Sequence, residues 1–137
     1  MSFILIIIVL NFSCSSLNLL KINQDDTVIS KTSMMENGDI CKEEWRENLL
    51  HGTTTCWNKS NKIISRVNYK NGYLDGKWIQ FYDNENVMYS INYSLGKKTG
   101  FEIWYYDNGS IQSKTEYLNN EIISEIIRWD NEGNIIE

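Results

Sequence analysis

Proline is absent from the chain, and histidine occurs only once in 137 residues. Without proline there is no polyproline linker and no proline-rich ligand segment. The single histidine, His51, precedes Gly52 in an expected turn, and its spacing to cysteine and aspartate matches no recognisable catalytic set. We therefore expect His51 to be a solvated turn residue, and we expect no catalytic residues and no enzymatic activity.

Cysteine is also scarce, with Cys14, Cys41 and Cys56 as its three positions. Neither Cys41 nor Cys56 has a CxxC or histidine companion, so no zinc or other metal site is expected. If Trp45 lies opposite Thr54, the two later cysteines are diagonal neighbours across the first hairpin, near the limit for a disulfide. Both a disulfide in an oxidising compartment and two free, half-buried thiols remain open.

Positive charge is in deficit, because the chain has 13 Lys and Arg residues but 18 Asp and Glu residues, which gives a formal net charge of -5. A protein that follows nucleic-acid phosphates needs a basic face, so no nucleic-acid partner is expected. The acidic balance also disfavours attraction to anionic lipid, and it suits a basic protein partner. Nothing in the sequence indicates a cofactor or a small-molecule substrate, and we expect neither.

Long apolar runs are lacking except near the N-terminus, where residues 3–10 read FILIIIVL. This run is shorter than the roughly 20 apolar residues that span a bilayer. It suits the hydrophobic region of a secretory signal peptide. Ser13 and Cys14 follow it and resemble a bacterial lipoprotein signal, in which the cysteine is lipidated and becomes the first mature residue. A lipidated Cys14, an export signal without lipid and a wrongly assigned chain start all remain open.

Composition divides the chain into three parts. Residues 1–14 are the expected signal or lipoprotein segment. Residues 15–36 are polar and irregular, which is typical of a flexible tether. Residues 37–137 are about 100 residues long, which suits a single domain.

The third part repeats with a period of 24 residues. Glycines recur at positions 52, 76 and 100, and three further columns keep the same spacing. These columns are Trp45, Tyr69, Tyr93 and Tyr117; Trp57, Phe81, Tyr105 and Trp129; and Ile63, Val87, Ile111 and Ile135. Four columns that hold one period without an insertion indicate tandem structural units.

Each unit carries the pattern of two strands and two turns. Asn-Gly pairs at residues 37–38, 71–72 and 108–109 predict tight hairpin turns. Because strand residues alternate between faces, one row is expected to hold Ile63, Ser65, Val67 and Tyr69. The return strands are expected to place Lys77-Ile79-Phe81, Phe101-Ile103-Tyr105 and Glu125-Ile127-Trp129 on a common face.

A lone hairpin is not stable in water, so the hairpins are expected to stack on one another. The prediction is an all-β fold: an elongated, single-layer antiparallel β-meander of about four 24-residue hairpin repeats, preceded by the N-terminal apolar signal segment. Ser124 stands where the other units have glycine, which is typical of an atypical terminal cap.

The two best units read YKNGYLDGKWIQFY at residues 69–82 and YSLGKKTGFEIWYY at residues 93–106. With these motifs, residues 37–137 resemble the MORN repeat, in the variant common in bacterial proteins described as antitoxin-like. The resemblance implies an elongated, twisted sheet that serves as a scaffold contacting proteins or lipids. It also implies an antitoxin or immunity role in a secreted or lipid-anchored protein.

Four aromatic residues of the central units are the candidate partner contacts. They are Trp78, Tyr82, Trp104 and Tyr106. Alternation places them on the face opposite Ile79, Phe81, Ile103 and Tyr105. An exposed aromatic patch of this kind can bind a protein partner. Alternatively, the rings cover one another as cross-strand ladders.

The expected function is a non-enzymatic protein-interaction module of the cell envelope, with an antitoxin-like or immunity role. It is expected to be a membrane-anchored lipoprotein held through Cys14, or a secreted or periplasmic protein. The alternative is a structural or membrane-associated scaffold of the envelope that has no toxin partner.

Overall fold

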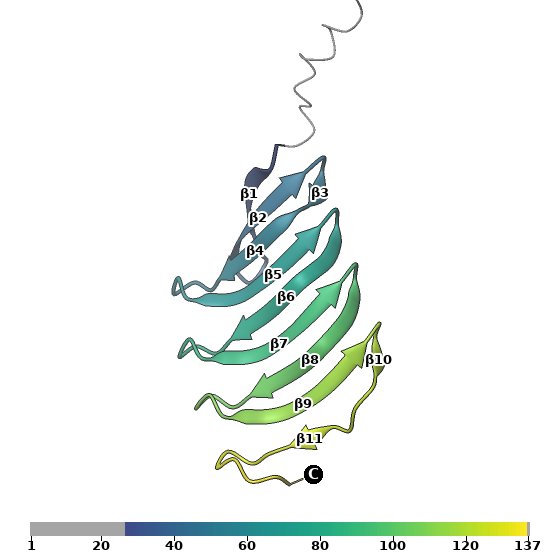
Figure 1. The fold of residues 1–137 in the computed structure, drawn as a ribbon. Helices are drawn as coiled ribbons and strands as arrows, with labels where there is room; N and C mark the ends of the chain where they lie inside the picture. Colours follow the sequence, from purple (N-terminus) through teal and green to yellow (C-terminus); the bar gives the residue numbers. More distant parts are fainter. Residues whose placement is uncertain (1–26, 137) are drawn as a thin grey trace, which may run out of the picture.

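The computed structural model describes residues 27–136, which form a single antiparallel sheet of eleven strands (Figure 1). The expected signal segment, with Cys14, and residues 15–26 of the expected tether lie outside the described residues. Within residues 27–136 there is no helix long and apolar enough to cross a membrane. The prediction of an all-β antiparallel meander is confirmed.

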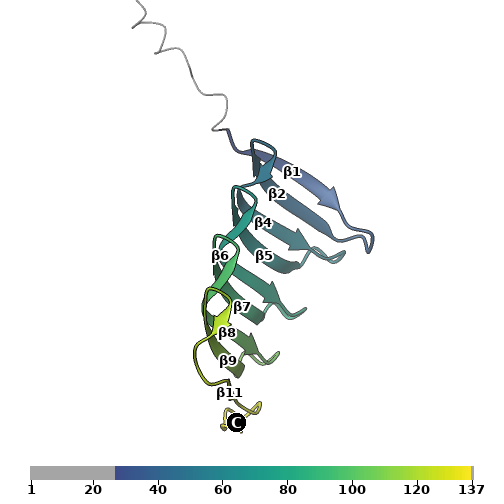
Figure 2. The same ribbon diagram turned by 90° about the vertical axis from the view of Figure 1, so that its right-hand side faces the viewer.

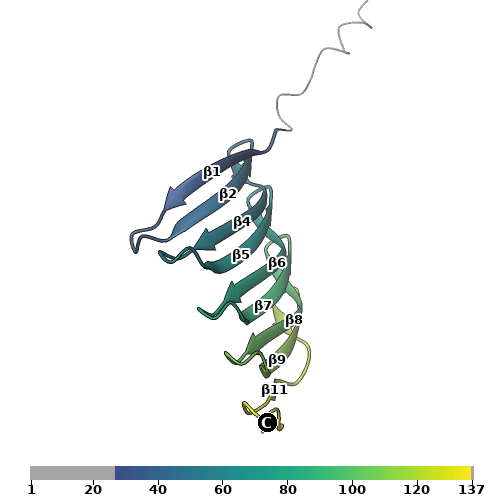
Figure 3. The same cartoon turned by 90° about the vertical axis from the view of Figure 1, so that its left-hand side faces the viewer.

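Most strands pair with their neighbours in the sequence. They are β1 (Ile29–Met34), β2 (Ile40–Arg46), β3 (Leu49–Leu50), β4 (Gly52–Trp57), β5 (Ile63–Lys70), β6 (Tyr73–Phe81), β7 (Val87–Ser94), β8 (Lys97–Tyr105), β9 (Ile111–Leu118), β10 (Glu121–Ile122) and β11 (Ile127–Arg128). The main order is β1-β2-β4-β5-β6-β7-β8-β9-β10, while β3 pairs with β2 and β11 with β9. In the two side views, Figures 2 and 3, no second layer of described residues covers either face.

Two kinds of turn alternate along the rims of the sheet. On one rim, four turns spaced 24 residues apart close with a backbone hydrogen bond between residues four apart, as from Tyr82 N to Asn86 O at 2.9 Å. On the other rim, two-residue turns place both residues at positive φ, the geometry of a type I′ turn. These pairs are Glu47 and Asn48, Asn71 and Gly72, Leu95 and Gly96, and Asn119 and Asn120.

Leu95 is the poorest residue for its turn. It has a φ of 48° and a side chain that is 65% exposed, so it lacks packing that would offset the left-handed conformation. Asparagine tolerates this conformation better than leucine. We expect Leu95→Asn to raise the free energy of unfolding by about 0.5–1 kcal/mol, measured by urea denaturation. Leu118→Asn, an exposed leucine at the end of β9, should give no gain; an equal gain would contradict the argument.

The recurring glycines mark an irregularity that bends each unit. Between Val67↔Trp78 and Tyr69↔Leu74, two steps along β5 correspond to four along β6, so β6 contains two extra residues. Gly76 lies within this insertion at a φ of 103°, where a Cβ would come 3.2 Å from the Asn68 Cβ. Residues other than glycine rarely adopt that backbone conformation, which explains why glycine recurs at this position.

The last unit lacks this glycine, and its return strand is broken. Residues 123–126 are not in a strand, and β10 and β11 have two residues each. The continuous strand expected through Glu125, Ile127 and Trp129 is therefore wrong. It is reduced to β11 and a single bridge between Trp129 and Ile135.

One face of the sheet holds every buried side chain of the described region; we call it the packed face. The buried residues are Cys41, Tyr89, Ile91 and Thr115, and Ile91 is the largest fully buried side chain. One row of directly opposed residues on this face runs through Cys41, Cys56, Ser65, Gln80, Tyr89, Trp104, Ser113 and Arg128. The packing of this single-layer sheet is therefore concentrated on the packed face.

The expected tether ends earlier than predicted, because residues 29–34 are β1 and pair with β2 from Ile29↔Trp45 to Met34↔Ile40. A turn between Met35 and Asp39 joins them, with Met35 N donating to Asp39 O at 2.8 Å. The boundary predicted at residue 37 is therefore wrong. The Asn37-Gly38 pair indicates a hairpin turn, and a hairpin requires a strand before the turn as well as after it.

A second correction concerns Ile63, which was expected on the same face as Ser65. The register shifts between Cys56 and Trp57, so Ser65 opposes Cys56 while Ile63 opposes Trp57. Since Cys56 and Trp57 are consecutive strand residues, their side chains point to opposite faces. Ile63 therefore lies with Trp57 on the face opposite the packed face.

Candidate interaction surface

The central tryptophans form a ladder of rings on the packed face. Trp78 and Tyr89 have ring centroids 5.7 Å apart, and Tyr89 and Trp104 have centroids 4.5 Å apart. Such contacts stabilise paired strands. Trp104 nevertheless remains 39% exposed, whereas Tyr89 is buried beneath it. The ring contacts of the ladder therefore explain the burial of Tyr89, and they leave much of the Trp104 side chain available for contact with a partner.

Trp104 borders a hollow of about 370 Å³ at the C-terminal end of the packed face. The lining side chains come from β8, the turn after it, β9 and the last unit: Trp104, Tyr106, Gln112, Ser113, Arg128, Trp129 and Ile136. Trp104, Ser113 and Arg128 oppose one another across three neighbouring strands, which fixes their relative positions. The hollow thus combines apolar walls with a guanidinium group.

Tyr82 and Tyr106 join successive units through their hydroxyl groups. Tyr82 Oη donates a hydrogen bond to Tyr105 O at 2.7 Å, and Tyr106 Oη donates to Trp129 O at 2.8 Å. Each bond reaches a carbonyl one repeat ahead, which gives these residues a structural role. Of the four predicted contact residues, the structure brings Trp104 and Tyr106 into one hollow, links Trp78 to Trp104 through Tyr89, and ties Tyr82 to the backbone.

We expect Tyr82→Phe to lower the free energy of unfolding by about 1 kcal/mol, because the half-buried Tyr105 carbonyl loses its donor. Urea denaturation at equilibrium measures this change. Tyr73→Phe is the matched control, since Tyr73 is 60% exposed and its hydroxyl has no partner among the described residues. An equal loss in both variants would contradict the inter-unit role of Tyr82.

A polar cluster lies beside Trp104 on the same strand. Glu102 Oε1 accepts hydrogen bonds from Tyr89 Oη at 2.8 Å and from Lys98 Nζ at 2.6 Å. Burial, and then the hydrogen bond to Glu102, raise the pKa of Tyr89 far above its ordinary value. Burial lowers the pKa of Lys98, but the hydrogen bond and charge of Glu102 outweigh it, so the pKa is raised. A group that transfers protons near neutral pH needs a pKa near 7. The pKa values of Tyr89 and Lys98 are both shifted away from that value.

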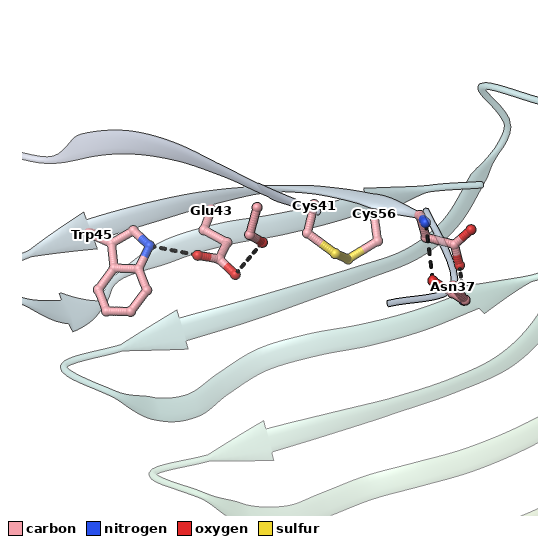
Figure 4. Close-up of a disulfide and its surroundings, with 7 residues drawn as sticks. Asn37, Cys41, Glu43, Trp45 and Cys56 are labelled. Atoms are coloured by element: carbon pink, nitrogen blue, oxygen red, sulfur yellow. Dashed lines mark hydrogen bonds between the residues drawn. A yellow bond between two sulfur atoms is a disulfide. The ribbon is translucent and has the colours of Figure 1, made fainter. Parts of the chain in front are cut away.

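At the other end of the sheet, Cys41 and Cys56 are joined by a disulfide with a Cα separation of 4.1 Å (Figure 4). The two residues oppose each other directly, which corrects the diagonal arrangement expected from the sequence. The expected register set Trp45 opposite Thr54, whereas Trp45 opposes Leu50, and two extra residues between Leu50 and Thr55 then bring Cys56 opposite Cys41. Nearby, Trp45 Nε1 donates to Glu43 Oε2 at 2.9 Å.

His51 lies in that irregular segment between β3 and β4, with its Nδ1 3.1 Å from Asn71 Oδ1. Its backbone N donates to Glu44 O at 2.8 Å, which fixes the bend of the chain. Among residues 27–136, no group of three or more His, Cys, Asp or Glu side chains could hold a metal ion. The contacts of His51 therefore give it a structural role in the bend between β3 and β4.

Sequence reasoning missed the residues that complete the hollow, notably Ser113 and Arg128. Neither belongs to an aromatic or glycine column, so the 24-residue pattern did not distinguish them. The available signal was the strand register, since residues opposite Trp104 must share its face.

Three of the described units are similar to a known repeat. The sequence pattern of the MORN repeat variant matches residues 50–71, 74–94 and 98–119. These segments hold β4 with β5, β6 with β7 and β8 with β9, so each match covers the two strands of one 24-residue unit. No curated protein matches the chain.

Proposed function

Because the chain carries three MORN-variant repeats, which form interaction or scaffold modules and are generally non-catalytic, we propose that it is a non-enzymatic interaction module that binds a protein partner at the Trp104 hollow. The observation that carries this proposal is Trp104 itself, which is 39% exposed at the border of a hollow of about 370 Å³. Tryptophan and arginine are the residue types that most often dominate the binding energy of protein interfaces. Here Trp104 and Arg128 line the same hollow.

The rigidity of the surroundings supports the same assignment. Trp104 rests on the buried Tyr89 ring, and Tyr106 is held by its hydrogen bond to Trp129 O. A binding residue that is already positioned loses little conformational freedom when a partner arrives. The hollow is therefore suited to receive a side chain of a partner without rearrangement of the sheet.

A binding experiment with Trp104→Ala tests this site. Cell-envelope extract is passed over immobilised wild-type protein, and each captured protein is purified and its affinity measured directly. Loss of the Trp104 side chain should weaken binding at least about tenfold. Tyr73→Ala, which removes an exposed aromatic side chain elsewhere on the sheet, should bind like the wild type. Unchanged affinity of the Trp104 variant for every captured protein would overturn the assignment.

We place the module in the cell envelope, held by a lipid on Cys14. The Cys41–Cys56 disulfide supports an oxidising compartment, because such bonds persist outside the reducing cytosol. The mass of the mature protein purified from its own cell is the test. Diacylglycerol on Cys14 would support the anchor, and an intact Met1 in a soluble product would contradict it.

An immunity or antitoxin-like role is the finer form of this proposal, because covering the surface of a toxin requires only a complementary binding site. The genes next to this one distinguish it from the alternative, a scaffold of the envelope without a toxin partner. An adjacent gene for a large secreted toxin supports immunity, and purified toxin should then bind the wild type and lose affinity for Trp104→Ala. A neighbourhood without such a gene favours the scaffold.

A further inference from the structure

The face opposite the packed face has a different charge from the chain as a whole. A continuous row of opposed residues crosses it through Lys42, Thr55, Arg66, Ile79, Ser90, Ile103, Lys114 and Ile127. This row contains three cations and no carboxylate, although the net charge of the chain is -5. Of the acidic residues, Glu44 and Glu116 lie on the same face beside this row, two residues from Lys42 and Lys114, while Asp83, Asp107 and Asp130 lie beyond the strands, at the rim turns. We call this surface the basic face.

The basic face contains a hollow of about 280 Å³ around Arg66. Trp57 and Ile63, which oppose each other across β4 and β5, form part of its wall. Phe81 forms another part, with its ring centre 5.9 Å from Arg66 Cζ. Asn61 and Glu85 complete the lining from the rim turns. The guanidinium thus lies among aromatic and aliphatic side chains.

Arg66 is exposed, and among the described residues no carboxylate forms an ion pair with it. Glu85 lines the same hollow without reaching ion-pair distance. An arginine beside an apolar surface is well suited to bind a carboxylate through two parallel hydrogen bonds. The low polarity of the aromatic walls strengthens that attraction relative to a fully solvated arginine.

We propose that this hollow binds an acidic side chain of a protein partner, with the carboxylate on Arg66 and a neighbouring apolar side chain against Trp57 and Phe81. The hollow lies on the other face from Trp104, so this second contact goes beyond the proposed function and does not depend on it. Charge complementarity selects the occupant: a basic or neutral segment of the same shape leaves Arg66 without a counter-charge.

The test uses the full chain and two capped dipeptides, N-acetyl-Glu-Leu-amide and its neutral counterpart N-acetyl-Gln-Leu-amide. Binding is followed by two-dimensional NMR through the indole N–H signal of Trp57. The acidic peptide should shift this signal with a dissociation constant in the millimolar range, and the neutral peptide should bind at least about fivefold more weakly. Equal shifts with both peptides, or no shift at about 10 mM, would overturn the proposal.

Three variants locate the contact. Arg66→Gln should weaken binding of the acidic peptide at least about tenfold, and Glu85→Gln should strengthen it about twofold by removing a like charge. Lys114→Gln is the matched control, since it removes a cation from the same row outside the hollow. Equal weakening by Arg66→Gln and Lys114→Gln would indicate only general attraction to the basic face and would overturn the site. Trp104→Ala should leave this binding unchanged, which separates the result from that of the packed face.

Discussion

Replacement of Ile91 by alanine is expected to lower the free energy of unfolding by about 3 kcal/mol. Ile91 is 1% exposed and is the largest fully buried side chain of the described region. It opposes Trp78 across β6 and β7, in the row that continues through Val67. Because no second layer covers the sheet, few other side chains can compensate for the lost contacts. Urea denaturation followed by tryptophan fluorescence measures the loss.

Two further variants show whether burial is the cause. Ile91→Val removes one methylene group and should cost about 1 kcal/mol. Ile79→Ala removes the same atoms as Ile91→Ala from the basic face, where Ile79 is only partly buried, and should cost clearly less. If Ile79→Ala were as destabilising as Ile91→Ala, packing would be shared equally by the two faces, and the assignment of one packed face would be wrong.

The architecture was predictable because its signals are local and periodic. Asn71-Gly72 can form a type I′ turn whatever lies around it. The Asn37-Gly38 pair also marks a hairpin turn, in which only Gly38 has a positive φ. Gly76 and Gly100 recur because the chain needs a positive φ at one point of each unit. Repetition at a fixed spacing then implies stacking, since no hairpin buries its apolar row alone.

Side-chain orientation was less predictable, because insertions change it without changing the 24-residue spacing. Trp45 opposes Leu50 and not Thr54, and two extra residues between Leu50 and Thr55 set Cys56 directly opposite Cys41 and not on the diagonal. A register shift beside Trp57 likewise moves Ile63 to the other face from Ser65. Strict alternation assumes regular strands, and it fails at bulges.

The candidate site was predicted in part for the same reason. Aromatic residues such as Trp104 are conspicuous in a sequence, and their half-buried position in a sheet follows from alternation. The hydroxyl contact of Tyr82 with the next unit depends on the distance between stacked turns, which no single unit specifies. Arg66 and Arg128 look alike in the sequence, and only the register assigns them to opposite faces.

The second large effect is expected at the N-terminal end of the sheet. The double substitution Cys41→Ala/Cys56→Ala should weaken the first hairpin by about 3 kcal/mol, the value typical for a disulfide that closes a loop of this length. The two cysteines are separated by 15 residues, and Cys41 is 3% exposed. The β1 strand is exposed along its whole length and pairs only with β2, so little else holds this end.

The loss should be confined to that end, because each unit of a repeat protein contacts only its neighbours. Amide hydrogen exchange should become roughly a hundredfold faster in β1 and β2, while β7 keeps the protection of the wild type. Met34→Ala, which removes a side chain of β1 that is 74% exposed and leaves the disulfide intact, is the control and should change neither region. Equal acceleration in β2 and β7 would mean that the sheet opens as one cooperative unit. The disulfide would then stabilise the whole sheet and not its N-terminal end alone.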